Sequence, residues 1–313
     1  MTTTTAPAVK VRQRPGDRWF SGTALFAGSM ILVTLAAVAL FLIVQSIPGL
    51  TATSDTASLL TSNFWAYVAP LAFGTVWASL LALLMAVPLS VAVALFISHY
   101  APRRLAQALG YIVDLLAAVP SVVFGLWGIM VLAPAVQPIY AWLNANMGWF
   151  PLFSGTVSST GRTIFTAAIV LAVMVVPIIT AICREIFLQT PVLHEEAALA
   201  LGATRWEMVK MAVFPFGRSG IVSASMLGLG RALGETMAVA MVLSVANVVS
   251  FQLFTAENPG TIPANIALTF PEAYGTNINV LIATGLILFV VTFAVNALAR
   301  WIVSRRKEFS GAN

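Results

Sequence analysis

The sequence predicts an all-α membrane protein that crosses the bilayer six times. Of its 313 residues, 59% are hydrophobic and only 9% are charged, whereas about 25% of the residues in average soluble domains are charged. So few charges cannot cover the surface of a soluble protein of this length. Six stretches reach the ~20 apolar residues that a spanning helix needs. They are Thr23–Val44, Leu71–Ile97, Tyr111–Leu132, Thr163–Cys183, Ser219–Ser244 and Asn279–Ile302.

The first stretch resembles a signal peptide in one respect, because a basic segment precedes it. Its apolar run extends from Thr23 to Val44, however, and so exceeds the ~7–15 apolar residues of a signal-peptide core. No small-x-small cleavage site follows the run. We therefore expect residues 1–22 to form a basic tail and residues 23–47 to form a first transmembrane helix that is retained.

Basic residues concentrate in alternate connecting segments, and this pattern predicts the orientation. They occur in the N-terminal tail, in loops 99–107 and 184–218, and in the tail 304–313. The connecting segments on the other side contain a single basic residue, Arg162. Because basic loops remain in the cytoplasm, both termini are expected there.

Proline interrupts the third stretch at an informative position. Pro120 lies in the run AAVPSVVFGLWG, where it removes a backbone donor and kinks or breaks a helix. In lipid, a broken helix is tolerated where it is buried in protein or lines a cavity. Ser121 offers a hydroxyl at this break and is therefore a candidate for the lining of a polar path. A simple kink is the alternative, as it is for Pro88 and Pro177 in the second and fourth stretches.

The fifth stretch carries two charges near its middle, Arg231 and Glu235. A charge at the bilayer centre costs about 2.5–3.5 kcal/mol on insertion scales, so such residues usually serve a function. Their spacing of four residues places them on one face of a continuous helix, where they can pair. Gly230 and Gly234 add a GxxxG spacing, which allows another helix to approach closely. This face is expected to line a polar path, and a buried structural ion pair is the alternative.

The loop 184–218 is predicted to contain two short helices. Glu195 and Glu196 suit the first turn of one helix, which ends at Gly202. Thr204 begins a capping box for the second helix, which we expect to stop before Pro215. A unit of this kind suits the docking of a soluble partner. A passive interfacial loop and a DNA-binding helix-turn-helix are the alternatives, and the second fits poorly because the loop has few basic residues.

Several kinds of site are missing from the sequence. It contains no GxxxxGK[ST] phosphate loop, so the chain is not expected to bind ATP by that means. It also contains no HExxH motif and no recognisable pair of nucleophile and base. The single cysteine, Cys183, excludes an intrachain disulfide, and His99 and His194 lack the spacing of metal ligands. We therefore predict a protein that is not an enzyme and has neither a metal nor another cofactor.

The docking loop resembles the EAA loop of permeases from ABC importers. The family pattern is EAA, three residues, Gly, nine residues and then I-x-L-P. In this chain Glu196, Ala197 and Ala198 precede Gly202, and Pro215 ends the pattern. In the family this loop forms a coupling helix that sits in a groove of the ATP-hydrolysing subunit. The resemblance thus implies that these residues, together with Glu195, couple the permease to the ATP-hydrolysing subunit.

Two further runs resemble the phosphate-specific permeases of the Pst system. They are MLGLGRALGETMAVAMV at 226–242 and AVPSVVFGLWG at 118–128, and the letters GETMAV favour the C-type subunit over its A-type partner. Ala212 and Phe214 depart from the Ile and Leu of the EAA pattern, but both remain apolar. The matches extend over most of the chain between residues 71 and 302.

The resemblance implies an architecture and a set of partners. The fold would be a type I (MetI-like) permease core of five helices within residues 70–303, preceded by one additional N-terminal helix. The partners would be an A-type permease subunit in a heterodimer, two copies of an ATP-binding subunit, an extracytoplasmic phosphate-binding protein and membrane lipid, without nucleic acid. The complex would import inorganic phosphate with high affinity across the inner membrane of a bacterium.

These inferences combine into one expected mechanism. Arg231 would contact phosphate transiently, and Glu235 would pair with Arg231 when no anion is present. Ser121, Gly234 and Thr236 would line the same path. ATP-driven movement of the coupling helix would tilt the fifth span. An ion-coupled secondary transporter, a channel, a membrane scaffold and an ABC permease for another small anion are the alternatives.

Overall fold

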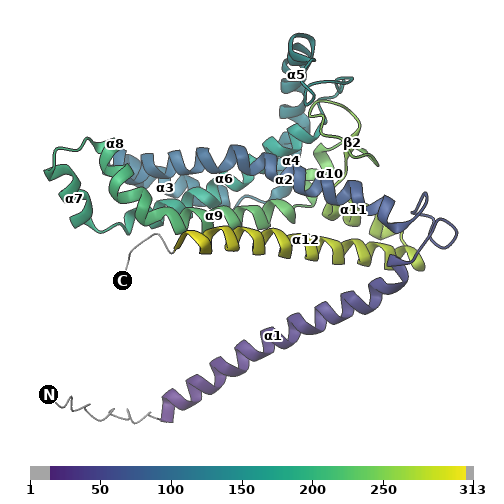
Figure 1. Ribbon diagram of the computed structural model, residues 1–313, viewed down its shortest axis with the longest axis horizontal. Coiled ribbons are helices and arrows are strands. Elements are labelled where there is room, and N and C mark those ends of the chain that lie inside the picture. The colour runs from purple at the N-terminus through teal and green to yellow at the C-terminus, as the bar shows by residue number, and fades with distance from the viewer. Residues whose placement is uncertain (1–14, 308–313) are drawn as a thin grey trace.

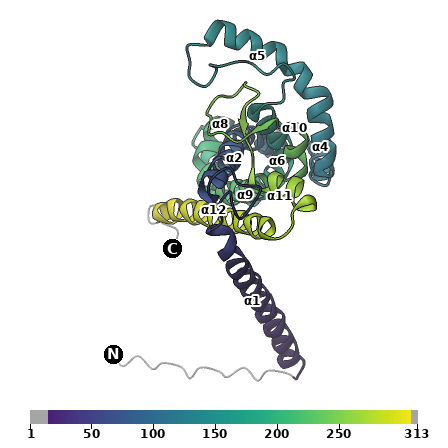
Figure 2. The same ribbon diagram turned by 90° about the vertical axis from the view of Figure 1, so that its right-hand side faces the viewer.

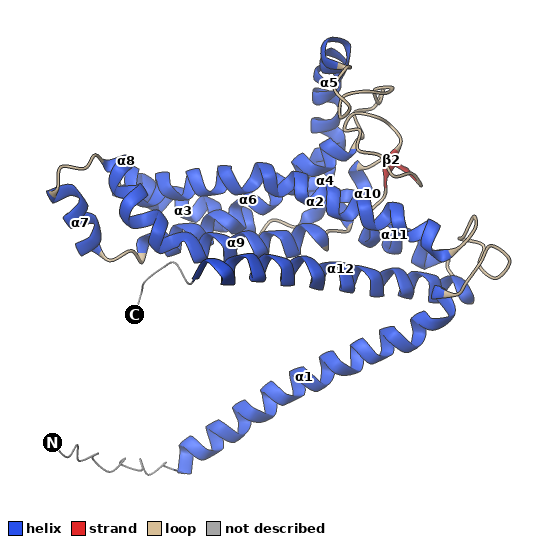
Figure 3. Cartoon of the chain, in the orientation of Figure 1, coloured by secondary structure: helices blue, strands red, loops and turns tan. Residues whose placement is uncertain are grey.

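The computed structural model describes residues 15–307, and helices dominate it (Figures 1 and 3). The predicted tails lie partly outside this range, because residues 1–14 and 308–313 are not described. In chain order the elements are α1 (Pro15–Leu50), α2 (Phe64–Leu95), η1 (Phe96–Tyr100), α3 (Arg103–Ala117), α4 (Ser121–Trp127), η2 (Gly128–Leu132), α5 (Ala133–Met147), α6 (Ile164–Leu188), α7 (Val192–Ala200), α8 (Arg205–Met208), η3 (Val209–Val213), α9 (Phe214–Leu233), α10 (Met237–Val242), β1 (Val245–Ala246), β2 (Asn258–Pro259), α11 (Ile262–Thr269), η4 (Phe270–Glu272) and α12 (Thr276–Lys307).

Six helical segments of the described chain are long and apolar enough to cross a membrane, which confirms the predicted number. Their hydropathy follows from the runs of apolar residues noted above, and their lengths of 25 to 37 residues exceed the ~20 residues that a bilayer requires. These segments are Trp19–Leu50, Phe64–Tyr100, Ser121–Met147, Ile164–Leu188, Arg205–Leu233 and Thr276–Trp301.

The predicted bounds of the third span, Tyr111–Leu132, are wrong. The helix is broken between α3 and α4, where Pro120 adopts an extended conformation with ψ of 139° and Ser121 begins α4. Proline has no N–H to bond the preceding turn and disfavours helical geometry in the residue before it. The continuous apolar helix therefore begins at Ser121 and extends through a π-helical turn to Met147.

The predicted fifth span, Ser219–Ser244, is also wrong in its bounds. The helix begins earlier, at Arg205, and runs through Pro215 without stopping. Pro215 lies in the first turn of α9, immediately after the π-helical turn η3, where proline is tolerated. The helix then ends at Leu233, and α10 is a separate element.

Helix α6 forms the centre of the bundle, and α2 and α9 pack on it (Figures 1 and 2). In its most apolar 18-residue segment, 67% of the residues are buried. Leu171 and Met174 of α6 are fully buried, as are Ala82 and Ala86 of α2. Small residues on one helix allow the backbone of another to approach closely, and this packing holds the three helices together.

Helix α1 leaves the bundle and touches the rest of the chain mainly near its C-terminal end (Figure 1). There Asn279 of α12 donates a hydrogen bond of 2.8 Å from Nδ2 to the carbonyl of Gln45. Gly49 lies directly against the backbone of Asn279, so a side chain at this position would collide with it. The most apolar segment of α1 has no buried residue, and its surface is open to lipid or to another chain.

The segment after α10 is anchored by one buried side chain, Asn258. It donates hydrogen bonds from Nδ2 to the carbonyls of Ser244 and Thr255, at 2.9 and 3.0 Å. Its Oδ1 accepts a hydrogen bond of 2.9 Å from the backbone of Ile164 at the start of α6. These bonds fix the short parallel pairing of β1 with β2 and hold this end of the protein against α6.

Candidate functional site

The centre of the candidate site is the break between α9 and α10. Gly234 ends α9, and Thr236 precedes α10. Arg231 is therefore in the last turn of one helix, whereas Glu235 lies in the connection to the next. No ion pair joins these two residues, both of which the structure describes, so the prediction that they pair on one helix face is wrong in this conformation. The physical reason is that the helix ends between them, which removes the i,i+4 geometry.

Glu235 is 9% exposed and stabilises the start of α10. Its Oε1 accepts a hydrogen bond of 3.2 Å from the backbone N–H of Ala238, as a residue at a helix N-terminus does. At the other end, Arg162 donates from Nη2 to the carbonyls of Met241 and Leu243, at 3.2 and 3.5 Å. Negative charge at the first turn and positive charge at the last turn both suit the helix dipole. The short helix α10 is thus held at both ends by charged side chains.

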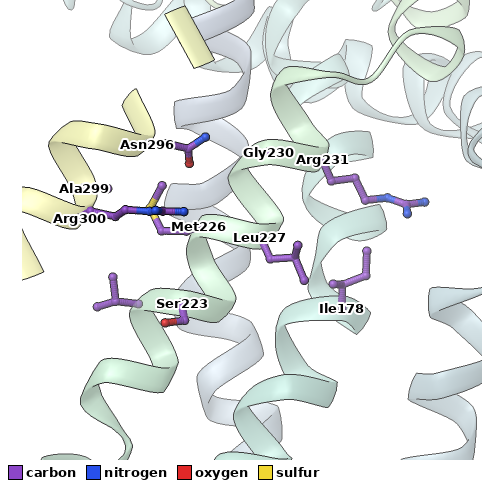
Figure 4. Close-up of a pocket in the computed structure, with 10 residues that line it drawn as sticks. Ile178, Ser223, Met226, Leu227, Gly230, Arg231, Asn296, Ala299 and Arg300 are labelled. Atoms are coloured by element: carbon purple, nitrogen blue, oxygen red, sulfur yellow. The ribbon is translucent and has the colours of Figure 1, made fainter. Parts of the chain in front are cut away.

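Arg231, in contrast, is exposed and lines a cavity of about 900 Å³ on the outer side of α9. Figure 4 shows its side chain extending to one side of α9, while Arg300 of α12 reaches toward α9 from the other side. Within residues 15–307, neither guanidinium group takes part in an ion pair. The residues that line the cavity are Ile178, Val222, Ser223, Met226, Leu227, Gly230, Arg231, Asn296, Ala299 and Arg300.

The two faces of α9 differ in their contacts. Ala224, Gly228 and Ala232 are buried on the side that packs against the bundle. A Cβ added at Gly230 would have no other atom within 4 Å, and one added at Gly234 would approach only backbone oxygens of its own helix. Within residues 15–307 the GxxxG spacing is therefore not used for close packing, and the cavity face of α9 remains open.

The second part of the candidate site is α7, which lies at one end of the bundle beyond α6 (Figures 1 and 3). Glu196 and Ala197 are exposed, whereas Ala198 is buried. Glu195 turns inward, and its Oε1 lies 3.3 Å from Nε2 of His99 in η1, the turn that follows α2. The side chains of Glu195 and His99 are 22% and 9% exposed. Thus one of the two adjacent glutamates connects α7 to the bundle, and the other faces outward.

The turn that follows α7 has the predicted chemistry. Gly202 has a φ of +86°, a conformation that glycine adopts easily and other residues rarely adopt. Thr204 and Glu207 form the expected capping box, in which Glu207 accepts from the backbone of Thr204 at 2.8 Å and donates its own N–H to the Thr204 hydroxyl at 3.3 Å. The second predicted helix, however, continues past Pro215 into α9, so the docking unit is joined directly to the helix that carries Arg231.

Comparison with known proteins decides the family. Residues 86–308 match the family of binding-protein-dependent transport system inner membrane components. The chain belongs to this family. It is thus a multi-pass membrane permease subunit, as the resemblance implied, and not an enzyme.

Similar proteins cover nearly the whole of this permease. The phosphate transport system permease protein PstC 2 of Mycobacterium tuberculosis is 50% identical over 313 residues, which cover 95% of this chain and 96% of that protein. PstC of Mycobacterium leprae is 46% identical over 303 residues, with coverage of 93% and 94%. PstC of Mesorhizobium japonicum is 40% identical over 308 residues, with coverage of 95% and 92%.

The fold of this permease also matches a solved structure. A bacterial ABC transporter that imports the acidic polysaccharide alginate superimposes with a TM-score of 0.63, covering 92% of this chain and 96% of the matched chain. The sequence identity is 17%, so this similarity concerns the fold alone. It confirms the all-α architecture of an ABC importer permease that the sequence resemblance implied.

The cavity of this permease contains only one of the five residues predicted for the path, Arg231. Ser121 begins α4 and is partly buried, Gly234 ends α9, and Thr236 donates a hydrogen bond of 3.3 Å to the carbonyl of Gly234. Glu235 caps α10, as described above. None of these four residues lines the cavity.

Three polar residues of the cavity were not predicted as path residues: Ser223, Asn296 and Arg300. Asn296 and Arg300 are four residues apart and therefore share one face of α12. Ser223 precedes Leu227 and Arg231 at the same spacing on α9. These spacings were visible in the sequence, but they do not reveal which face of α12 lies next to α9.

Proposed function

We propose that this permease subunit forms one half of the translocation path of an ATP-driven importer of inorganic phosphate. The observation that carries the proposal is that two arginines, Arg231 of α9 and Arg300 of α12, line the same cavity. Guanidinium groups remain charged and bind phosphate oxygens in a bidentate manner. Relatives with 40% to 50% identity over nearly the whole chain are named phosphate transport permeases, which supports phosphate as the anion.

We further propose that residues 70–303 form the permease domain, that residues 184–218 form its coupling loop, and that residues 304–313 and the basic N-terminal tail are cytoplasmic. The concentration of basic residues in alternate segments supports this orientation. In Figure 1, α7 lies at the same end of the bundle as the C-terminal end of α12. In the proposed orientation both would lie on the cytoplasmic side, where α7 can meet a soluble partner.

The open face of α9 supports a second permease subunit as a partner. A cavity of about 900 Å³ with two unpaired cations is expensive to expose to lipid, since a charge in the hydrocarbon region costs several kcal/mol. An A-type subunit that covers this face would enclose a polar path between the two chains. The unused spacing of Gly230 and Gly234 would let its backbone approach closely.

Two copies of a separate ATP-binding subunit and an extracytoplasmic phosphate-binding protein complete the proposed complex. Exposed residues of α7, including Glu196 and Ala197, would contact the ATP-binding subunit, and Gly202 and Pro215 would shape the ends of this docking unit. Because α8 continues into α9, a push on this unit would reach Arg231 along one helix. Lipid would surround the other faces of the bundle, in the inner membrane of a bacterium.

Phosphate uptake into vesicles that contain the reconstituted complex tests the proposal. Uptake should require hydrolysable ATP, and an excess of sulfate should not abolish it. Arg231→Gln should lower uptake at least about tenfold, because a charge-assisted contact is lost. Arg104→Gln is the matched control, since Arg104 is exposed on α3 and does not line the cavity. Normal uptake by Arg231→Gln would contradict the role of this residue, and preferred uptake of sulfate would contradict the substrate.

A further inference from the structure

A second polar cavity lies between α3 and α6, away from the cavity of Arg231. It has a volume of about 490 Å³. Helix α3, which supplies half of its lining residues, lies toward the end of the bundle that carries α7 and α8 (Figures 1 and 3). The proposed translocation path uses none of its residues. They are Ile97, Ser98, Ala101, Arg103, Ala106, Gln107, Tyr111, Asp114, Arg184 and Leu188.

Arg184 is the central group of this cavity. It belongs to the last turns of α6 and is only partly exposed. Its Nε is buried and has no hydrogen-bond partner among the residues that the structure describes. A buried polar group without a partner is costly, so this guanidinium group, which lines the cavity, is the group for which a bound anion would be most favourable.

The neighbouring helix is shaped to accept this guanidinium group. Gly110 is the one residue of α3 that is fully buried, and a Cβ at this position would collide with Nη1 of Arg184. The absence of a side chain thus lets Arg184 lie across α3 and face the cavity. Arg103, one and a half to two turns earlier on α3, adds a second positive charge to the lining.

The cavity also contains one acidic side chain, Asp114. No ion pair joins it to Arg103 or Arg184, all three of which lie within the described range. With two cations and one anion, the lining favours a ligand with a single negative charge over a phosphate dianion. The carboxylate can also accept a hydrogen bond from an ammonium or hydroxyl group that the same ligand carries.

Two of the side chains that line the cavity are apolar in large part and exposed. Leu188 is 57% exposed, and Tyr111 is 76% exposed. An exposed leucine side chain at a basic pocket suits an acyl chain next to a phosphate, and tyrosine is common at the level of the headgroups.

We propose that this cavity binds the headgroup of a membrane glycerophospholipid. Its phosphodiester would accept hydrogen bonds from Arg184 and Arg103, and its ammonium or hydroxyl group would approach Asp114. Its acyl chains would pass the exposed side chains of Leu188 and Tyr111. The lipid would belong to the cytoplasmic leaflet, an assignment that rests on the proposed orientation of the chain. The binding site itself is independent of the transport function.

Native mass spectrometry of the full-length protein, released from phospholipid-containing micelles, tests the proposal. The wild-type protein should retain phospholipid. The amount of phospholipid retained by Arg184→Gln should be lower by a factor of about ten or more, because charge-assisted hydrogen bonds are lost. Gly110→Ala should reduce retention without any change in charge, since it displaces the guanidinium group. Arg104→Gln should retain lipid normally, because Arg104 is an exposed arginine of α3 outside the cavity.

A second arm separates the two sources of a phosphate group. Millimolar inorganic phosphate is added to wild-type protein that carries bound phospholipid. Continued retention of the lipid supports the phosphodiester ligand, whereas replacement of the lipid by phosphate overturns it. Equal lipid retention by wild type, Arg184→Gln and Gly110→Ala also overturns the proposal. Phosphate uptake is not measured in either arm, so a failure here leaves the proposed transport function unaffected.

Discussion

The buried carboxylate of Glu235 allows a sharp test of what this residue does. Its Oε1 accepts the N–H of Ala238 at 3.2 Å and so caps α10. Glu235→Ala leaves that buried N–H without a partner, at a cost of about 1 kcal/mol with a range of roughly 0.5–2 kcal/mol. Glu235→Gln keeps an oxygen that can accept the same hydrogen bond but removes the charge. The alanine variant should therefore be clearly less stable than the glutamine variant.

Thermal unfolding of the purified permease and phosphate uptake by the reconstituted complex measure the two effects separately. For Glu235→Ala, a loss of 1 kcal/mol corresponds to a fall in Tm of roughly 2–4 °C in a protein of about 200 residues, and less in a longer chain. Glu235→Gln should retain nearly the wild-type Tm. If it nevertheless loses uptake, the charge acts in transport in addition to the cap. Glu257→Ala, at an exposed position, is the control.

The result that would refute the reasoning is a wild-type Tm for Glu235→Ala. Such a result would mean that the bond to Ala238 contributes nothing to stability. Equal destabilisation by alanine and glutamine would refute it in another way, because the charge rather than the acceptor oxygen would then stabilise α10.

Two further predictions concern the coupling unit and the core. His99→Ala removes the 3.3 Å contact between His99 and Glu195. The loss of about 0.5–1 kcal/mol should lower the phosphate transported per ATP hydrolysed by a factor of roughly two to five, while the ATPase activity of the complex continues. An unchanged ratio would contradict this. Gly228→Val places a Cβ 2.7 Å from side-chain atoms of Val175 and Ile179. Tm should therefore fall in line with an overpacking cost of about 1–3 kcal/mol. An unchanged Tm would show that α6 and α9 are not tightly packed there.

Hydropathy and local turn chemistry were sufficient to predict much of the fold. The number of spans follows from the length of the apolar runs, because each run must satisfy its backbone within the membrane. The capping box at Thr204 and the positive φ of Gly202 depend on residues within a few positions, and the structure has both. Local signals of this kind do not depend on how distant helices pack.

The break after Leu233 could not be predicted from hydropathy, because the apolar run continues through Val242. Glycine is tolerated inside helices and does not by itself mark an end. The decisive interaction is the hydrogen bond from the backbone N–H of Ala238 to the carboxylate of Glu235. In a continuous helix, a backbone carbonyl of the preceding turn would accept this N–H instead. The charge of Glu235 in an apolar stretch thus predicts a functional role, but it does not reveal that the side chain caps α10.

The stop expected before Pro215 failed for a different physical reason. Proline is disfavoured inside a regular helix, yet here it follows a π-helical turn, Val209–Val213, and lies in the first turn of the α-helical segment. No sequence signal used above detects such a turn. The consequence is functional, because α8, η3 and α9 form one uninterrupted helix between the docking unit and Arg231.

The break between α9 and α10 changes what the two charges can do in the proposed mechanism. Arg231 belongs to the helix that begins at the docking unit, so it should follow any movement of that unit. Glu235 is tied to α10, whose Ala238 packs closely against Gly125 of α4. A push transmitted along α9 would therefore change the distance between the two charges, which a single rigid helix could not do. If the charges act as separate groups in this way, Arg231→Gln should impair phosphate uptake without lowering Tm, whereas Glu235→Ala should lower Tm. A loss of both uptake and Tm in both variants would instead favour a structural ion pair.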